Sequence, residues 1–318
     1  MTKSNRSVRR TVPTRQTQTT TAKSNRAKRA AAKGHTVSKR KAQSRRPWGV
    51  FLSIGGVTVL FIAVIAFLEI TASSSAVGAG STKTTPAQAS IVSAVTKVPA
   101  SELKQVGTGA ANTPPTPLKS GPRLTSNGKP EVLFIGAEYC PYCALERWAL
   151  IGAMGRFGTW HHLSLIRSSA TDPAGPNVPT FTFAHGATYT SKYISFVSRE
   201  MYSNIPDPSS PAGYTSLQRL TRQQAQLLSK FGHNGFPFVD FGGIAAQIGS
   251  VSSSPGPTAL SNLTWKQVAH DLTQPKSSQA QMILGGINYD TAAICKMTGN
   301  QPGSVCDQPI VQKLEAGL

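Results

Sequence analysis

Two cysteines separated by two residues form the stretch of this sequence that could carry out chemistry. The tetrapeptide Cys140-Pro141-Tyr142-Cys143 suits thiol–disulfide exchange, in which one thiolate forms a mixed disulfide with a substrate and a neighbouring thiol then releases it. We expect Cys140 to attack and Cys143 to resolve the mixed disulfide. Pro141 and Tyr142 lie between the thiols, and we expect them to tune the reduction potential.

The residues on either side of the tetrapeptide predict a strand that leads into a helix. Residues 132–135 are an unbroken apolar run typical of a buried strand, and residues 144–154 are good helix formers with an apolar side. A helix that begins at Pro141 would direct unpaired backbone N–H groups at Cys140 and favour its thiolate. A C-x-x-C motif between a strand and a helix is typical of a redox site.

A structural zinc site is the alternative for a C-x-x-C motif, and it requires two further ligands. The remaining cysteines, Cys295 and Cys306, lie eleven positions apart and do not have the spacing of a zinc knuckle. We expect them to form a structural disulfide, which an oxidising compartment permits. A second redox relay is the alternative for this pair. The sequence predicts no metal site and no cofactor.

Other ionisable side chains give weaker signals. Glu138 lies two positions before Cys140 and could relay a proton, although a solvated side chain is the simpler interpretation. Five histidines show no ligand spacing, and we interpret them as surface or structural residues. They are His161, His162, His185, His233 and His270, of which only His233 lies near a segment with an expected role.

Positive charge is concentrated at the start of the chain. Residues 1–47 contain 15 Lys or Arg and no Asp or Glu, so 18 basic and 13 acidic residues remain for the rest. Low hydrophobicity and charge of a single sign predict a disordered tail. Such a tail could bind nucleic acid through its charge, but the apolar segment that follows favours a role in membrane topology.

Residues 48–68 are 21 residues without a charge, which is long enough for a transmembrane helix. Because Lys and Arg flank only one side, the positive-inside rule places the tail in the cytoplasm and the rest of the chain outside. Anionic lipids would also attract the tail. A cleaved signal peptide is the alternative, although its apolar region is usually shorter. We therefore predict a single-pass protein of the cell membrane.

The chain after the apolar segment divides into a spacer and a domain. Residues 69–128 are rich in Ser, Thr, Ala, Pro and Gly, and we expect a flexible spacer there. Residues 129–318 are expected to fold as an extracytoplasmic domain. Its patterns predict strands at 161–167, 180–183 and 192–202, a loop at 205–213, a helix at 216–231, two strands within 236–251, and helices at 264–272 and 277–296.

The C-x-x-C after a strand, and a Gly235-Phe236-Pro237 segment before a hairpin and a terminal helix, resemble the thioredoxin-like superfamily. Within it, residues 125–310 are most similar to the membrane-anchored domain-of-unknown-function family 929. The resemblance implies an α/β fold with a central mixed sheet flanked by helices, here with an inserted β/helical segment. It also implies that Pro237 follows a cis peptide bond and that Phe236 and Pro237 offer backbone groups to a substrate chain.

Val178-Pro179-Thr180 is a rival for the cis-proline loop. It lies 39 positions after Cys140, a distance that short thioredoxins and glutaredoxins show. The superfamily order places a helix before this proline, and residues 168–177 cannot form one. The helix predicted at 216–231 precedes Pro237, so we favour Pro237.

These features predict a membrane-anchored extracytoplasmic thiol–disulfide oxidoreductase that acts on cysteines of exported proteins. Its expected partners are those proteins, the lipid bilayer, and a membrane redox protein that recycles the cysteine pair. A non-catalytic thioredoxin-fold binding or assembly module is one alternative. The other is a metallochaperone in which Cys140 and Cys143 hold a soft metal such as Cu(I).

Overall fold

The computed structural model describes residues 84–318. The tail expected at residues 1–47, the membrane span expected at 48–68 and the first part of the expected spacer lie outside the described residues. Between residues 84 and 318, no helix combines the length and the apolar character that crossing a bilayer requires.

A mixed sheet is built around β4 (Lys129–Gly136), the strand that precedes the cysteine motif. On one side β4 pairs with β12 (Phe238–Phe241) in antiparallel orientation, and on the other with β9 (Ser195–Glu200) in parallel orientation. Beyond β12 lie β13 (Ala245–Ile248) and β2 (Thr116–Pro117), and β3 (Thr125–Ser126) forms a hairpin with the start of β4. The expected central mixed sheet flanked by helices is confirmed.

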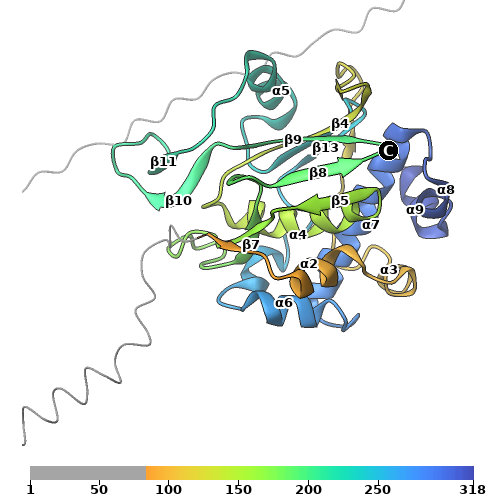
Figure 1. Cartoon of the computed structure of the whole chain (residues 1–318), viewed down its shortest axis with the longest axis horizontal. Coiled ribbons are helices and arrows are strands. Elements are labelled where there is room, and N and C mark those ends of the chain that lie inside the picture. The colour runs from red at the N-terminus through yellow and green to blue at the C-terminus, as the bar shows by residue number, and fades with distance from the viewer. Residues whose placement is uncertain (1–83) are drawn as a thin grey trace, which may run out of the picture. The chain divides into compact units, whose positions relative to one another are not determined.

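The alternating side chains of β4 explain the layers of the molecule. Val132 and Phe134 point into the larger hydrophobic core, whereas Leu133 and Ile135 point into a second core on the opposite face of the sheet. The larger core is covered by α4 (Pro141–Gly155) and α7 (Ser278–Thr298), and the second by α5 (Arg222–Gly232), as Figure 1 shows. Because both faces are covered, this strand reads as a continuous apolar run.

The segment inserted between α4 and α5 consists of strands and loops, without the helical part expected from the sequence. The single strand expected at 161–167 is two strands, because His162 adopts a left-handed conformation with φ 56° and breaks the run. The strand expected at 192–202 is shorter, and residues within the expected loop at 205–213 extend a hairpin. The strands are β5 (Gly158–His161), β6 (Ser164–Arg167), β7 (Pro179–Thr182), β8 (Thr188–Ser191), β10 (Tyr202–Pro206) and β11 (Tyr214–Ser216).

The prediction of a flexible spacer at residues 69–128 is wrong for residues 84–128, because these residues belong to the folded domain. This part contains β1 (Thr85–Pro86), α2 (Ala89–Thr96) and α3 (Ala100–Val106). Ile91, Val95 and Leu103 are buried in the larger core. The Asn288 amide of α7 donates to the carbonyls of Leu103 and Gly107, both at 2.8 Å. Residues 84–128 contain few apolar residues, which is why the sequence suggested a spacer. The apolar residues of α2 and α3 nevertheless have helical spacing and face α4 and α7.

Helix α5 begins six residues later than expected because a capping box fixes its start. The Thr221 side chain accepts from the Gln224 N–H, and the Gln224 side chain accepts from the Thr221 N–H. The remaining helices are the 3₁₀ helix η1 (Gly256–Leu260), α6 (Trp265–Asp271), α8 (Gly303–Cys306) and α9 (Pro309–Glu315). The last two were not expected from the sequence.

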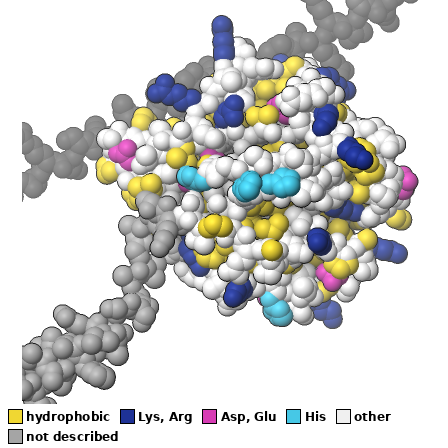
Figure 2. Space-filling model, viewed as in Figure 1, with side chains coloured by type: hydrophobic (Ala, Val, Ile, Leu, Met, Phe, Trp, Pro, Cys, Tyr) yellow, Lys and Arg dark blue, Asp and Glu magenta, His cyan; other side chains and the backbone are white. Residues whose placement is uncertain are grey.

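The charged side chains on one face of the domain are dispersed. On the face drawn in Figure 2, Lys and Arg side chains stand singly among neutral atoms and form no continuous basic surface. The positive charge of the whole chain, +20, comes mainly from residues 1–47, which contain 15 Lys or Arg and no Asp or Glu.

Candidate active site

Strand β4 leads directly into the cysteine motif, and Cys140 occupies the N-cap of α4. Its backbone is extended (φ −74°, ψ 121°), and Pro141 is the first helical residue. The Cys143 N–H donates to Cys140 Sγ at 3.2 Å. Cys140 thus takes the place of a capping side chain, because the first N–H groups of a helix have no partner within the helix.

The two thiols differ in environment. Both cysteines are free thiols, and Cys140 is 7% exposed whereas Cys143 is fully buried. Hydrogen bonds from the Cys143 side chain and backbone lower the pKa of Cys140, against the effect of burial, and the charge of Arg147 lowers it further. Burial and the neighbouring Cys140 raise the pKa of Cys143 well above its ordinary value. The thiolate is therefore favoured at Cys140 and disfavoured at Cys143.

The Phe236-Pro237 segment lies beside the cysteine motif. Its peptide bond is cis. Phe238 pairs with Ile135, so the register continues to Pro237 opposite Gly136. A Cβ at Gly136 would lie 3.1 Å from Cys143 Sγ, so the strand passes close to the thiol at this glycine. No described residue bonds to the backbone N–H or carbonyl of Phe236.

The rival segment at residues 178–180 has a different position. The three cis peptide bonds among residues 84–318 precede Pro237, Pro255 and Pro302, and Pro179 is not among them. The Pro179 carbonyl accepts from Trp148 Nε1 at 2.8 Å, and Thr180 Oγ1 donates to the Ala144 carbonyl at 2.8 Å. This segment therefore packs along the side of α4.

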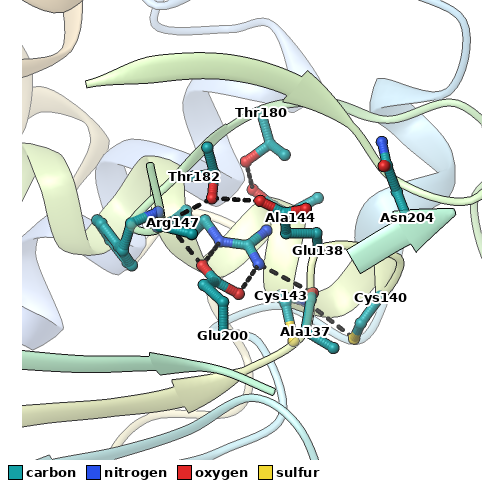
Figure 3. A network of polar contacts seen from close by, with 12 residues as sticks. Ala137, Glu138, Cys140, Cys143, Ala144, Arg147, Thr180, Thr182, Glu200 and Asn204 are labelled. Carbon is teal, nitrogen blue, oxygen red and sulfur yellow. Dashed lines mark hydrogen bonds and ion pairs between the residues drawn. The ribbon is translucent and has the colours of Figure 1, made fainter. Parts of the chain in front are cut away.

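A buried ion pair lies beside the cysteine motif (Figure 3). Arg147 of α4 donates from Nε to Glu200 Oε1 at 2.8 Å and from Nη2 to Glu200 Oε2 at 2.6 Å. Both side chains are completely buried. Arg147 Nη2 also donates to the Ala137 carbonyl at 2.9 Å. Burial lowers the pKa of Arg147, but the charge and hydrogen bonds of Glu200, together with the charges of Cys143 and Glu138, outweigh it and raise the pKa of Arg147 above its ordinary value.

Glu138 is buried next to this ion pair, although the sequence favoured a solvated side chain. Its Oε1 accepts from Thr182 Oγ1 at 2.6 Å and lies 3.2 Å from Nε2 of His185. The Glu138 side chain is 3% exposed and that of His185 is 41% exposed. Burial raises the pKa of Glu138. The Glu138–His185 contact therefore connects the buried Arg147–Glu200 pair beside the motif with the surface.

Three tyrosines gather beside Cys140. The Tyr139 ring stacks on Tyr214 at a centroid distance of 4.1 Å and lies 6.3 Å from Tyr202. The Tyr214 hydroxyl donates to Ser169 Oγ at 2.7 Å. These contacts hold the β10–β11 hairpin against the residue that precedes Cys140. Tyr142, between the cysteines, is half-buried and packs on the larger core.

The other residues singled out from the sequence lie away from the motif. Cys295 at the end of α7 and Cys306 of α8 form a disulfide. His233 is an exposed C-cap residue of α5, His161 lies in β5, His162 follows it, and His270 lies in α6. Within residues 84–318, no three His, Cys, Asp or Glu side chains come together as a metal site.

Sequence reasoning missed Arg147, Glu200 and Thr182, and it interpreted His185 only as a surface or structural residue. Arg147 carried a signal, since it is a charged residue four positions after Cys143 in a helix that is otherwise apolar on that side. Its partner Glu200 lies 53 positions away, and only the parallel pairing of β4 with β9 brings it there.

Comparison with known proteins identifies one family. The model of the family described as Domain of unknown function (DUF929) matches residues 118–296. No curated protein and no solved structure matches the chain.

Proposed function

Since the chain belongs to the DUF929 family, whose description gives no function, we propose that it is a thiol–disulfide oxidoreductase of thioredoxin-like fold, anchored in the cell membrane. The pair Cys140 and Cys143 exchanges disulfides with cysteines of exported proteins. Because residues 118–296 contain the motif, β9, α5 and the β12–β13 hairpin, the proposal concerns the part of the chain that the family shares.

The order of elements supports the thioredoxin-like part of the proposal. Strand β4, helix α4 and the parallel strand β9 are followed by α5, the antiparallel hairpin β12–β13 and the long helix α7. Thioredoxin-like proteins share this order around their C-x-x-C motif. The strands between α4 and β9 would then be an insertion that leaves the sheet uninterrupted.

The position of Cys140 at the start of α4 is the observation that carries the proposed chemistry. The helix supplies the Cys143 N–H to Cys140 Sγ and lies with its positive end at that sulfur. A thiolate is therefore favoured at the more exposed cysteine, while the buried one stays protonated. Attack by Cys140 followed by resolution by Cys143 requires this difference in protonation between the two thiols.

The exchange proceeds in two displacements. The Cys140 thiolate attacks a substrate disulfide, so that one substrate sulfur is released as a thiolate and the other is bound to Cys140. Cys143 then loses its proton and attacks Cys140 Sγ, which forms the Cys140–Cys143 disulfide and releases the second substrate thiolate. Read in reverse, the same steps oxidise two substrate thiols, and the reduction potential of the pair decides the direction.

Substrate binding is assigned to the segment opposite the motif. The Phe236 N–H and carbonyl have no partner among the described residues and lie one position beyond the pair that Pro237 would form with Gly136. They could pair with an extended substrate chain, as an additional strand does at a sheet edge. The Pro237 carbonyl accepts from Gly249 at 2.8 Å and is therefore not free to do so.

The proposed location rests on two sequence features and one bond. The apolar run at 48–68 and the basic residues before it predict an anchor with the domain outside. The Cys295–Cys306 disulfide fits an oxidising compartment. The recycling partner would then be a further membrane protein with access to the same side.

Catalysed reduction of insulin by dithiothreitol tests the proposal, with the Cys140 and Cys143 serine variants measured in parallel. We expect wild-type protein to accelerate the reduction, Cys140→Ser to abolish the acceleration, and Cys143→Ser to accumulate mixed disulfides with substrate. A wild-type protein without turnover would support a non-catalytic assembly module. Stoichiometric retention of Cu(I) without turnover would support a metallochaperone.

A further inference from the structure

We propose that Arg147 is a positioning residue for the resolving step: its buried guanidinium, fixed by Glu200 and the Ala137 carbonyl, stabilises negative charge on Cys143 when that thiol attacks the mixed disulfide. This inference rests on the proposed exchange reaction. It adds to that reaction the group that allows a completely buried thiol to ionise.

The placement of Arg147 is fixed from three sides. It follows Cys143 by one helical turn on α4, and residues four apart are neighbours on a helix surface. The Ala137 carbonyl that accepts from Arg147 Nη2 at 2.9 Å also accepts from the Cys140 N–H at 3.3 Å. Glu200 binds the guanidinium through two oxygens. The positive charge therefore cannot move away from the motif without breaking these bonds.

One donor of Arg147 remains unused. Arg147 Nη1 is buried and has no hydrogen-bond partner among residues 84–318. A buried donor without a partner is costly, and negative charge that forms nearby would reduce this cost. The charge of Arg147 acts on both Cys140 and Cys143 and lowers the pKa of each thiol.

Cys143 is the thiol that requires this assistance. It is completely buried, and burial raises its pKa well above the ordinary value. In the resolving step the Cys143 S–H bond breaks, a Cys143 Sγ–Cys140 Sγ bond forms, and the Cys140–substrate S–S bond breaks. The cysteine pair is oxidised and the substrate is reduced. The proton lost by Cys143 is balanced by the one that the released substrate thiolate takes up from solvent.

Other ionisable groups around the two cysteines add to or offset the positive charge of Arg147. Glu200 on β9 offsets it directly, and Glu138, after β4, contributes a second carboxyl that His185 contacts from the surface. Tyr139 is also close, and burial together with the two cysteines raises its pKa to about 12. Glu146, on the same helix as Arg147, instead accepts from the Val251 N–H at 2.8 Å and interacts with Asp290 of α7.

Stability alone is a weak reason for a buried ion pair at this position. Replacing such a pair by well-packed apolar residues is often neutral or stabilising, because desolvation offsets the attraction between the charges. A role in the thiol chemistry explains why the bidentate Arg147–Glu200 pair is buried beside the C-x-x-C motif.

The two steps can be observed separately with the aromatic disulfide dithiobis(nitrobenzoate). Attack by Cys140 releases a first nitrothiobenzoate anion and leaves the second attached to Cys140. Attack by Cys143 then releases the second anion, so each step gives its own absorbance change. The pH dependence of the second release reports the ionisation of Cys143. The measurement uses the full chain in detergent, reduced beforehand.

Two matched substitutions break the same ion pair but leave opposite charges. Arg147→Gln leaves Glu200 and removes the positive charge, so we expect the midpoint of the second release to move to higher pH. Each unit of increase in the pKa of Cys143 lowers its thiolate fraction about tenfold, and we expect a slowing of about tenfold or more at neutral pH. Glu200→Gln leaves Arg147 unopposed, so we expect the midpoint to move to lower pH.

A merely structural role predicts a different outcome, because both substitutions would disturb the packing alike. Midpoints that move in the same direction, or that do not move, would overturn the inference. If Arg147→Gln does not fold, Glu200→Gln and Arg147→Lys test the inference instead. We expect the midpoint of the second release in Arg147→Lys to stay close to that of wild type. Absence of the first release in wild-type protein would instead refute the proposed function itself.

Discussion

At the scale of single residues, the domain places several ionisable groups in its interior. Cys143, Arg147 and Glu200 are fully buried at the motif. Glu146 and Asp290 are fully buried between α4 and α7, and three of their four carboxyl oxygens have no partner among the described residues. Buried carboxyls of this kind are retained as neutral acids, so their effect on stability depends on pH.

Burial raises the pKa of Glu146 from 4.5 to about 8, and burial together with Glu146 raises that of Asp290 well above 3.8. Between those two values for Glu146, the unfolded chain has released its proton while the folded chain keeps it. The folded state therefore binds more protons, and the free energy of unfolding falls as the pH rises through this window. The total loss attributable to Glu146 is on the order of 5 kcal/mol.

We expect Glu146→Gln to remove most of this dependence, so that the variant gains stability relative to wild type between pH ~5 and pH ~8. Urea denaturation at three pH values in this window measures the difference. Glu315→Gln, on the partly exposed end of α9, serves as the control and should follow the wild-type curve. Parallel curves for wild type and Glu146→Gln would show that the buried acid is ionised in the folded state.

At the scale of elements, α4 unites packing and chemistry. Its first residues hold the thiols, and its following turns fill the space between the sheet and α7. Gly152 illustrates how closely the two helices approach, because a Cβ there would lie 2.3 Å from Ile287 Cδ1 of α7. The cysteine motif is therefore fixed by the most completely buried helix of the described region.

The Cys295–Cys306 disulfide joins α7 to α8, and α9 packs on α7 beyond it. We expect the double variant Cys295→Ser/Cys306→Ser to lose about 2–4 kcal/mol of unfolding free energy. It should nevertheless reduce insulin at the wild-type rate, because the pair lies away from α4's first turn. Chemical denaturation and the turnover assay measure the two effects.

Lys296→Ala is the matched control for this prediction, since it replaces the exposed neighbour of Cys295 on the same helix. We expect it to change neither quantity. A folded double variant that has lost turnover would indicate instead that Cys295 and Cys306 take part in the redox relay.

At the scale of the whole molecule, the segment before β2 is an integral part of the domain. Leu103 is 1% exposed in the larger core, whereas the next residue, Lys104, is exposed. Two hydrogen bonds from Asn288 attach the end of α3 to α7. The sequence predicted that the domain starts at residue 129, but the folded domain begins at residue 84 or earlier.

We expect Leu103→Ala to lower the unfolding free energy of the whole domain by about 2–5 kcal/mol, the range for replacing a buried leucine by alanine. The transition should remain a single one when followed both by far-UV circular dichroism and by tryptophan fluorescence. Lys104→Ala should leave it unchanged. A normal main transition for Leu103→Ala, preceded by a small early one, would mean that α2 and α3 unfold independently of the sheet.

The sequence by itself determined the local features of the site. An apolar run, a proline after the first cysteine and a string of helix formers specify a strand, an N-cap and a helix through contacts between neighbours in the chain. Pattern also identified the hairpin after Pro237 and the central position of β4, because a strand buried on both faces must be apolar throughout.

Only the tertiary structure decided which distant groups surround the thiols. Glu200 reaches Arg147 through the parallel pairing of β4 with β9, and the Pro237 segment reaches Gly136 through the antiparallel pairing with β12. Burial of Glu138, and the packing of α2 and α3 on α7, likewise depend on segments far away in the chain. Periodicity reports which side of an element is apolar, but not which partner covers it, and it is the partner that sets the charge and burial at Cys143.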